Sequence, residues 1–176
     1  TDEIAAQLES VFGDFDVAAA KTGMLATAEV VELVTDHVAG VDVPVVVDPV
    51  MVATSGDRLL ESAAESAYEA LCAQATLVTP NADEAEVLTG VEVTDTASAQ
   101  TAADALLDLG AAAALVKGGH VPGDEVVDVL ATPETIETLT HPRVETEATH
   151  GSGCMLSAAI AEQESLATLK GVDAGL

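Results

Sequence analysis

The stretch that most constrains the fold is a run of three valines, residues 45–47, which lies between Pro44 and Asp48. The run is β-branched throughout and does not alternate with polar side chains, which is typical of a strand covered on both faces. Such strands occur in parallel sheets with helices on both sides. The sequence therefore predicts an α/β fold, with Asp48 at the carboxyl end of a strand, where open α/β sheets bind ligands.

Short apolar segments and amphipathic segments alternate along the rest of the chain. Strands are predicted over residues 16–20, 44–48, 75–78 and 112–116. Helices are predicted over residues 4–12, 28–38, 61–73, 82–89 and 97–109, and a further helix is expected to start at Cys154. Residues 126–130 and 134–139 are expected to form a hairpin-like pair of exposed strands. Because there is no internal repeat or linker, residues 1–176 are interpreted as one domain with a mostly parallel central sheet flanked by helices.

The charge balance excludes some classes of partner. Asp and Glu number 31 against 5 Lys and Arg, which gives a formal net charge of −26. Nucleic acid is excluded because its phosphates require a basic face, and an anionic membrane surface is disfavoured for the same reason. The chain is nevertheless 49% hydrophobic, so it is not expected to be disordered. The evenly spread acid excess indicates a halophilic surface, adapted to salt that screens its self-repulsion.

The cysteines and the apolar segments bear on the compartment. Cys72 and Cys154 lie far apart, with no Cys-x-x-Cys pattern or Cys/His cluster, which argues against a disulfide framework or a zinc site and suits a reducing compartment. The sequence shows no leader pattern and no apolar run long enough to span a bilayer. We therefore expect a soluble, cytoplasmic protein.

A glycine-rich stretch, Gly151-Ser152-Gly153-Cys154, leads directly into an alanine-rich helical run. Free backbone N–H groups at a helix start, together with the helix dipole, form a cradle for a phosphate or for developing oxyanion charge. Cys154 would lie in the same field, which favours anionic groups. The alternative is that this is a glycine-rich entry to a core helix, with Cys154 as a small buried hydrophobe.

Polar or glycine residues follow four of the predicted strands. They are Lys21-Thr22-Gly23, Asp48, Asn81 and Lys117-Gly118-Gly119. The carboxyl ends of parallel strands meet at one edge of a sheet, so these residues and the Gly151 loop are predicted to form one composite site. On so acidic a chain Lys21 and Lys117 either meet an anionic ligand or form salt bridges with nearby carboxylates, and the sequence leaves both open.

Five motifs in this order resemble those of the hydroxymethylpyrimidine/phosphomethylpyrimidine kinases of thiamine biosynthesis, which belong to the ribokinase-like superfamily. The motifs are Lys21-Thr22-Gly23-Met24-Leu25, Val47-Asp48-Pro49-Val50-Met51, Thr79-Pro80-Asn81 with Glu84, Lys117-Gly118-Gly119-His120 and Thr149-His150-Gly151-Ser152-Gly153-Cys154. The similarity covers residues 16–160. Its most specific part is Cys154, because most ribokinase-like enzymes have aspartate there. The resemblance implies a ribokinase-like three-layer fold.

The resemblance also implies an activity, the phosphorylation of hydroxymethylpyrimidine and then of its monophosphate by ATP. Such chemistry depends on positioning and on electrostatic stabilisation. By analogy, the backbone of Gly151, Ser152, Gly153 and Cys154 would hold the transferring phosphoryl group. Cys154 would also accept the proton of the substrate hydroxyl.

The same analogy assigns the remaining site residues. Asn81 and Glu84 would organise Mg²⁺, largely through water, and Asp48 would belong to the same metal and phosphate network. Lys117 would meet the phosphates of ATP. The pyrimidine would be lined by Met24 and Val50.

Each assignment has a structural alternative that the sequence leaves open. Asp48 is also a plausible strand-ending residue before Pro49, and Glu84 a first-turn acid that serves only the helix dipole. Met24 and Val50 also suit a packing role. His120 and His150 are interpreted as structural or loop residues.

The chain departs from the family pattern at both ends. Family members are longer and begin with a strand and a glycine-rich loop that helps to form the substrate pocket, and residues 162–176 show no convincing further helix. The sequence is therefore interpreted as a partial kinase domain. Pyridoxal kinase, from the same cysteine-bearing branch, and a non-catalytic domain for ligand sensing or assembly stay as alternatives. Besides ATP and a pyrimidine, a homo-oligomer or a fused neighbouring domain is a possible partner.

Overall fold

The computed structural model describes residues 1–51, 62–146 and 151–170, and all six strands of this part of the chain join one sheet in the order β1-β2-β3-β4-β5-β6. The strands are β1 (Ala20–Thr22), β2 (Val45–Val47), β3 (Leu77–Val78), β4 (Ala114–Val116), β5 (Glu125–Ala131) and β6 (Ile136–Pro142). The first four are parallel, and β5 and β6 are antiparallel to their neighbours. The mostly parallel sheet predicted from the sequence is confirmed.

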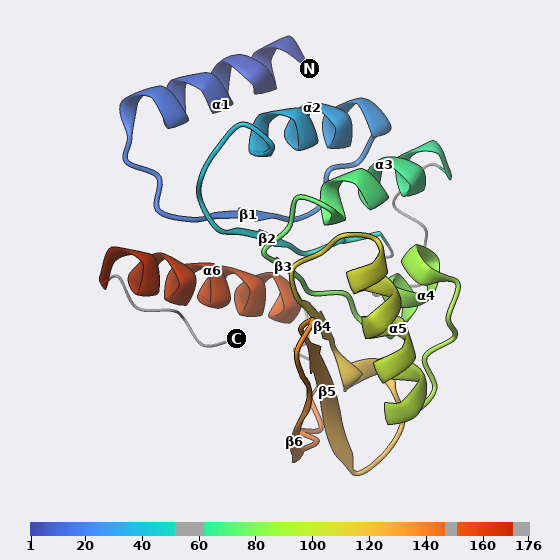
Figure 1. Cartoon of the computed structure of the whole chain (residues 1–176). Helices are drawn as coiled ribbons and strands as arrows, with labels where there is room; N and C mark the ends of the chain where they lie inside the picture. Colours follow the sequence, from blue (N-terminus) through green and yellow to red (C-terminus); the bar gives the residue numbers. More distant parts are fainter. Residues whose placement is uncertain (52–61, 147–150, 171–176) are drawn as a thin grey trace.

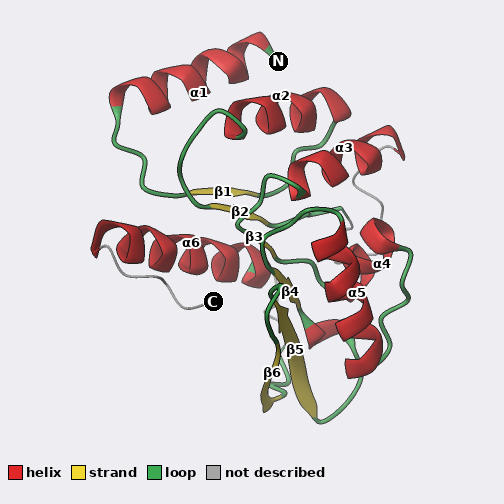
Figure 2. Cartoon of the chain, in the orientation of Figure 1, coloured by secondary structure: helices red, strands yellow, loops and turns green. Residues whose placement is uncertain are grey.

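The helices lie on both sides of this sheet, as Figures 1 and 2 show. They are α1 (Asp2–Asp14), α2 (Ala28–Val38), α3 (Ser62–Cys72), α4 (Ala82–Thr89), α5 (Thr96–Asp108) and α6 (Ser152–Lys170), with a short 3-10 helix, η1, at Gly118–His120. The side with α2 to α5 holds the larger core, whereas α6 covers the opposite side (Figure 1).

Successive side chains of the central strand β4 point to opposite faces of the sheet and contribute to a different core on each face. On β4, Ala114 and Val116 belong to the larger core, while Leu115 belongs to a smaller cluster with Leu77, against which Ile160 of α6 packs. All three valines of β2 are buried, with at most 2% exposure. This double coverage is the reason for the unbroken β-branched run.

The first strand lies later in the chain than predicted. It runs over Ala20–Thr22 instead of residues 16–20, because pairing begins where β2 begins, with Ala20 opposite Val45 and the Ala20 N–H bonded to the carbonyl of Pro44 (2.8 Å). Residues 17–19 are half-buried but have no place in the ladder. An apolar run alone does not fix the register of an edge strand.

Two further expectations concern the later part of the chain. The hairpin-like pair is confirmed as the antiparallel β5 and β6, but the expected exposure holds only for β6, because Val129 and Ala131 of β5 are buried in the larger core. Residues 162–170 continue α6, which ends at Lys170, and do not form a further helix, as expected. Residues 171–176 lie outside the described part. Over the described residues, no helix combines the length and the apolar character needed to cross a membrane.

Candidate active site

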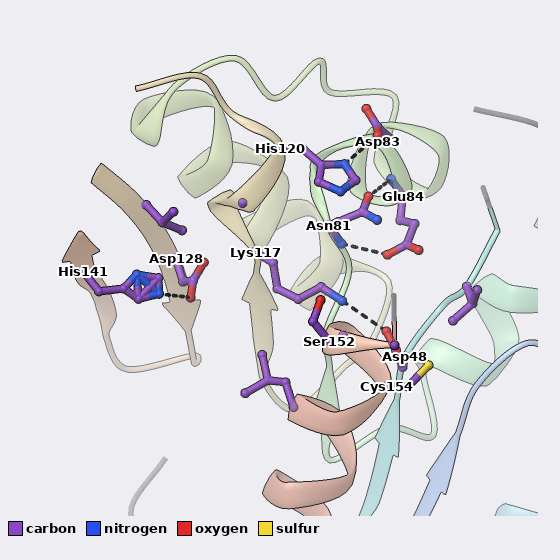
Figure 3. Close-up of a pocket in the computed structure, with 16 residues that line it drawn as sticks. Asp48, Asn81, Asp83, Glu84, Lys117, His120, Asp128, His141, Ser152 and Cys154 are labelled. Atoms are coloured by element: carbon purple, nitrogen blue, oxygen red, sulfur yellow. Dashed lines mark hydrogen bonds and ion pairs between the residues drawn. The ribbon is translucent and has the colours of Figure 1, made fainter. Parts of the chain in front are cut away.

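A pocket of about 390 Å³ opens where the carboxyl ends of β2, β3 and β4 meet the amino end of α6 (Figure 3). Most of the residues that line it are polar or charged, and they come from segments far apart in the sequence. The lining residues are Asp48, Val50, Asn81, Asp83, Glu84, Lys117, Gly119, His120, Val126, Asp128, His141, Gly151, Ser152, Gly153, Cys154 and Leu156. Asp48, Asn81, Lys117, Gly119 and the Gly151 loop of the predicted composite site thus line one cavity, whereas Lys21-Thr22-Gly23 and Gly118 lie outside its lining.

Asp48 lies at the floor of the pocket and is only 1% exposed. Its Oδ1 accepts a hydrogen bond from Lys117 Nζ (3.2 Å), and its Oδ2 accepts one from the hydroxyl of Ser157 (3.2 Å). Lys21 Nζ lies 3.9 Å from the same Oδ2. A buried carboxylate is costly unless it is paired and hydrogen-bonded, and these partners meet both conditions.

The start of α4 holds Asn81 and Glu84 in a capping box. The Asn81 side chain accepts the Glu84 N–H (2.9 Å), and the Glu84 carboxylate accepts the Asn81 N–H (2.8 Å). This arrangement satisfies two backbone donors that the first turn of a helix leaves without partners. It also fixes the Glu84 carboxylate, which is only 3% exposed, beside the cavity.

Burial raises the pKa of Glu84 above its ordinary value, and the negative charge of Asp48 adds to the rise. The hydrogen bond from the Asn81 backbone and the positive charge of Lys117 oppose it. A carboxylate whose pKa is raised by desolvation gains from any cation that comes to its side. The Glu84 environment is therefore suited to a cationic ligand as well as to a cap.

The amino end of α6 reaches the pocket through Gly151, Ser152, Gly153 and Cys154. Gly151 has φ +77°, and its carbonyl accepts the Met155 N–H (2.9 Å) in the first turn. A Cβ at Gly153 would lie 3.1 Å from Lys117 Nζ, so the glycine lets the ammonium group approach the backbone closely. Cys154 is exposed and lines the cavity, which overturns the alternative of a buried hydrophobe.

The segment after β4 brings Lys117 and His120 to the other wall. The Lys117 N–H donates to the carbonyl of Pro80 (2.8 Å), which ties this segment to the start of α4. His120 Nδ1 lies 2.8 Å from the Asp83 carboxylate at the rim, where both side chains are about half exposed. The conformation of η1 thus carries a lysine inward and a histidine to the edge of the cavity (Figure 3).

Nine of the ten residues predicted for the site line this one pocket. Met24 is the exception, because it lies outside the lining and is 55% exposed. Lys21 and Lys117 each pair with Asp48, which confirms the salt-bridge alternative for both lysines. Lys117 also lines the cavity, and its contact with an anionic ligand stays a prediction. Thr149 and His150, which belong to the glycine-rich motif, lie outside the described residues.

The sequence interpretation missed several residues of the site. Ser157 lies one helical turn beyond Gly153, and this spacing alone could have placed it on the same face of α6. Asp128 and His141 lie on neighbouring strands of the predicted hairpin and line the pocket, with His141 Nε2 3.6 Å from Asp128 Oδ2. No local signal distinguishes these two from other polar residues of an exposed hairpin.

The oxygen donors present suit one hard cation only in part. Within the described residues, no group of three or more His, Cys, Asp or Glu side chains is arranged to hold a metal ion. Mg²⁺, however, keeps several waters and is usually held by one or two carboxylates together with the phosphates of its nucleotide. Asp48 and Glu84, both beside the cavity, match that chemistry.

Comparison with known proteins gives consistent findings. A family model described as phosphomethylpyrimidine kinase matches residues 1–170. The hydroxymethylpyrimidine/phosphomethylpyrimidine kinase of Streptomyces coelicolor is 47% identical over 161 residues, which cover 91% of this chain and 60% of that protein. The corresponding protein of Rhizobium meliloti is 44% identical over 90% of this chain and 60% of its own length.

Solved structures are similar over nearly the whole chain. An ADP complex of Bacillus subtilis pyridoxal kinase superposes with a TM-score of 0.89 at 35% identity, covering 99% of this chain and 65% of that one. A phosphomethylpyrimidine kinase from Clostridium difficile gives 0.81 at 31% identity, over 94% of this chain and 68% of that one. The ribokinase-like α/β fold implied by the sequence motifs is therefore confirmed.

The chain spans 60% of the length of the two curated relatives described above. Within that span, the matched residues include every part of the pocket that the structure describes. Sequence, fold and pocket agree, and the chain belongs to the phosphomethylpyrimidine kinase family.

Proposed function

We propose that the protein containing this chain transfers a phosphoryl group from ATP to the hydroxymethyl group of hydroxymethylpyrimidine, and then phosphorylates the monophosphate. The observation that carries the proposal is the meeting of Cys154, Lys117 and Asp48 in one cavity at the amino end of α6. Names of the relatives support the choice of reaction. Phosphoryl transfer asks mainly for positioning and for stabilisation of negative charge, which this arrangement offers.

The proposed roles follow from chemistry and position. The substrate hydroxyl oxygen attacks the γ-phosphorus, its proton passes to the thiolate sulfur of Cys154, and the bond between the γ-phosphorus and the leaving oxygen of ADP breaks. Backbone N–H groups of residues 151–154 face the developing charge on the phosphoryl oxygens, with the dipole of α6 behind them. Lys117, which already reaches this backbone, contributes a positive charge to the same oxygens.

Mg²⁺ fits the oxygen donors at the other side of the cavity. Asp48 and Glu84 would hold it largely through water, and Asn81 would keep Glu84 in place through the capping box. When bound, the ion would offset the charge of the nucleotide phosphates. The desolvation of Glu84, which raises its pKa, supports a cation at this carboxylate.

The pyrimidine is proposed to lie against Val50, an apolar residue of the lining next to Asp48. Met24, the other predicted contact, lies outside the cavity lining with an exposed side chain. We propose it as a contact only for a substrate that extends beyond the cavity.

Pyridoxal is the second candidate substrate. One of the solved structures with the highest similarity is a pyridoxal kinase, whose TM-score of 0.89 covers 99% of this chain. Both acceptors are aromatic nitrogen heterocycles with a hydroxymethyl group, so the described pocket does not separate them by chemistry. The identity to the curated pyrimidine kinases, up to 47%, favours the pyrimidine.

The experiment is a coupled assay of ADP release with each acceptor in turn, in the presence of Mg²⁺. We expect turnover with hydroxymethylpyrimidine that exceeds turnover with pyridoxal. Turnover of pyridoxal alone would replace the proposed substrate. Nucleotide binding without turnover of either acceptor would instead support a non-catalytic ligand-sensing domain.

A further inference from the structure

The segment that carries Lys117 and His120 to the pocket, residues 117–123, is a turn without a regular ladder of its own. Its backbone groups are largely bonded to residues outside the turn. On one side, the Lys117 N–H donates to Pro80, at the start of α4. On the other side, two charged side chains of the β5–β6 hairpin reach the turn, Asp128 and Arg143.

Asp128 binds the amide side of the turn. Its Oδ1 accepts the Gly118 N–H at 2.8 Å, while its Oδ2 faces His141 Nε2 at 3.6 Å. Gly118 is pressed so closely onto β5 that a Cβ there would overlap the backbone carbonyl of Val127. The carboxylate therefore holds the residue directly after Lys117 in a place that no other amino acid fits.

Arg143, just after β6, binds the carbonyl side of the same turn. Its guanidinium donates three hydrogen bonds, to the carbonyls of Gly119 (2.8 Å), Gly123 (2.7 Å) and Val121. Its own backbone N–H donates to Asp124 (3.0 Å), which fixes the base of the side chain. A planar group with five donors in a fixed fork can serve three carbonyls at once, and a lysine cannot.

This use of an arginine is notable in a chain with 5 basic and 31 acidic residues. With acidic groups abundant on the surface, a cation has many carboxylates to pair with. Arg143 instead places three hydrogen bonds on neutral backbone carbonyls of one turn. The arrangement fixes a segment of backbone, and the segment it fixes leads to Lys117.

We propose that Asp128 and Arg143 are positioning residues that hold the turn 117–123 in place as a clamp, Asp128 through a backbone N–H group and Arg143 through backbone carbonyls. They thereby fix the position of the Lys117 ammonium group in the pocket. The catalytic consequence rests on the proposed function, since it requires a nucleotide phosphate as the partner of Lys117. Lys117 Nζ lies between Asp48 and the Gly153 backbone, and a shift of the turn would move the ammonium group away from both. Misplacement of about 1 Å is enough to weaken such a contact strongly.

The test measures the turn and the site separately, in the purified protein. Hydrogen exchange at the amides of residues 118–123 reports the clamp, and calorimetric ATP affinity reports the site. Arg143→Lys keeps the charge but loses the fork, and we expect about tenfold faster exchange and about tenfold weaker ATP binding. Asp128→Ala should act in the same direction, whereas Asp128→Asn, which keeps an acceptor oxygen for Gly118, should restore most of both.

Glu137→Gln is the matched control, because Glu137 is an exposed residue of β6 paired with Leu130 and away from the turn. It should change neither readout. The acceptor KM of the clamp variants should also stay close to that of the unmodified protein, whereas a general loss of structure would raise both KM values.

Unchanged exchange in Arg143→Lys, or faster exchange with unaltered ATP affinity, would overturn the proposal. Should Arg143→Lys fail to fold, the contrast between Asp128→Ala and Asp128→Asn decides the same question. If the unmodified protein binds no ATP, the proposed function fails, while the exchange data still show whether the clamp exists.

Discussion

Asp48 is a carboxylate with 1% exposure, and two of the five basic residues of the chain reach it. Lys21 and Lys117 face this carboxylate, and the Ser157 hydroxyl donates a hydrogen bond to it. Lys117 also lines the pocket, so its ammonium group is placed to meet an anionic ligand that enters there.

Glu84 gives the first prediction. Burial raises its pKa, so the ionised form is disfavoured in the folded state, and the carboxylate lowers stability at any pH above its folded-state pKa. Stability should therefore rise as pH falls through that pKa toward the unfolded-state value. Glu84→Gln keeps an acceptor for the Asn81 N–H, removes the buried charge, and should make the protein more stable at neutral pH.

The same substitution should impair function, because the proposed cation loses one of its two carboxylates. We expect Mg²⁺-dependent ATP turnover to fall by about tenfold or more. Urea unfolding at neutral and acidic pH, together with the turnover assay, checks both effects. Glu86→Gln, on the exposed face of α4, is the control and should alter neither. A Glu84→Gln protein with lower stability and normal turnover would contradict the assignment.

At the scale of the element, α4 and α5 both begin with a capping box, but only the cap of α4 lies beside the pocket. Asn81 and Glu84 close the start of α4 beside the pocket, and Asp95 and Ser98 close the start of α5 away from it. The two helices therefore allow a stabilising role to be separated from a functional one.

Asn81→Ala should lower the free energy of unfolding by about 1 kcal/mol, the usual cost of losing a cap. It should also lower ATP turnover by about tenfold, because it releases Glu84 from the capping box. Asp95→Ala removes the equivalent cap and should also lower stability, yet leave turnover unchanged. Equal losses of turnover in the two variants would show that Asn81 acts through stability alone. Denaturant titration and the coupled assay measure the two quantities.

Helix α3 gives a prediction at alkaline pH. Burial raises the pKa of Tyr68 from 10.0 to about 12, and its hydroxyl donates to the carbonyl of Gly23 (3.3 Å) in the segment after β1. Burial likewise raises the pKa of Cys72 to about 12. Between pH 10 and pH 12 the unfolded chain loses the Tyr68 proton and the folded chain keeps it, so stability should fall as pH rises through this window.

The measurement is simple because Tyr68 is the only tyrosine and the chain has no tryptophan. The ultraviolet absorbance of tyrosinate should appear near pH 12 in the folded protein and near pH 10 in denaturant. In Tyr68→Phe, the free energy of unfolding should fall less steeply between pH 10 and pH 12 than in the unmodified protein. Titration of the folded protein at the value of free tyrosine would show that the side chain is accessible to water.

The elements also show what sequence patterns can and cannot predict. The valine run of β2 could be predicted as a strand of a parallel sheet, because burial on both faces favours an unbroken run of β-branched residues. The first strand begins later than predicted because β1 takes its register from β2. The two strands lie far apart in the sequence, so the local pattern around β1 does not specify this pairing. The end of α6 was missed for a related reason, since Glu162 and Gln163 are exposed and carry no apolar periodicity.

At the scale of the whole molecule, the convergence of strand ends could be predicted because parallel topology brings them to one edge. The spacing of Ser157 from Gly153 places it on the same face of α6, but its partner Asp48 could not be predicted, nor could the partners of Arg143, because tertiary contacts set them. Ser157 meets Asp48 across 109 positions, and Arg143 meets carbonyls whose place depends on the turn. A serine in an alanine-rich helix and an arginine after an exposed strand look like ordinary surface residues in the sequence.

The net charge of −26 belongs to the whole molecule and gives a prediction of its own. Self-repulsion opposes the compact state, and molar salt screens it. We expect the protein to lose structure on dialysis from molar to millimolar salt, as followed by circular dichroism. Sucrose in place of salt serves as the control, because it stabilises without screening charge. A spectrum and a melting temperature independent of salt would contradict a halophilic surface.

The central claim is that one cavity, formed by strand ends and the amino end of α6, binds ATP and places Cys154 to accept the substrate proton. The most direct measurement compares Cys154→Ala with the unmodified protein in single-turnover phosphorylation of hydroxymethylpyrimidine and in ATP affinity. The account predicts that the rate of phosphoryl transfer falls by about 10²-fold or more while ATP affinity stays the same. An unchanged rate, or a protein that binds no ATP at all, would contradict it.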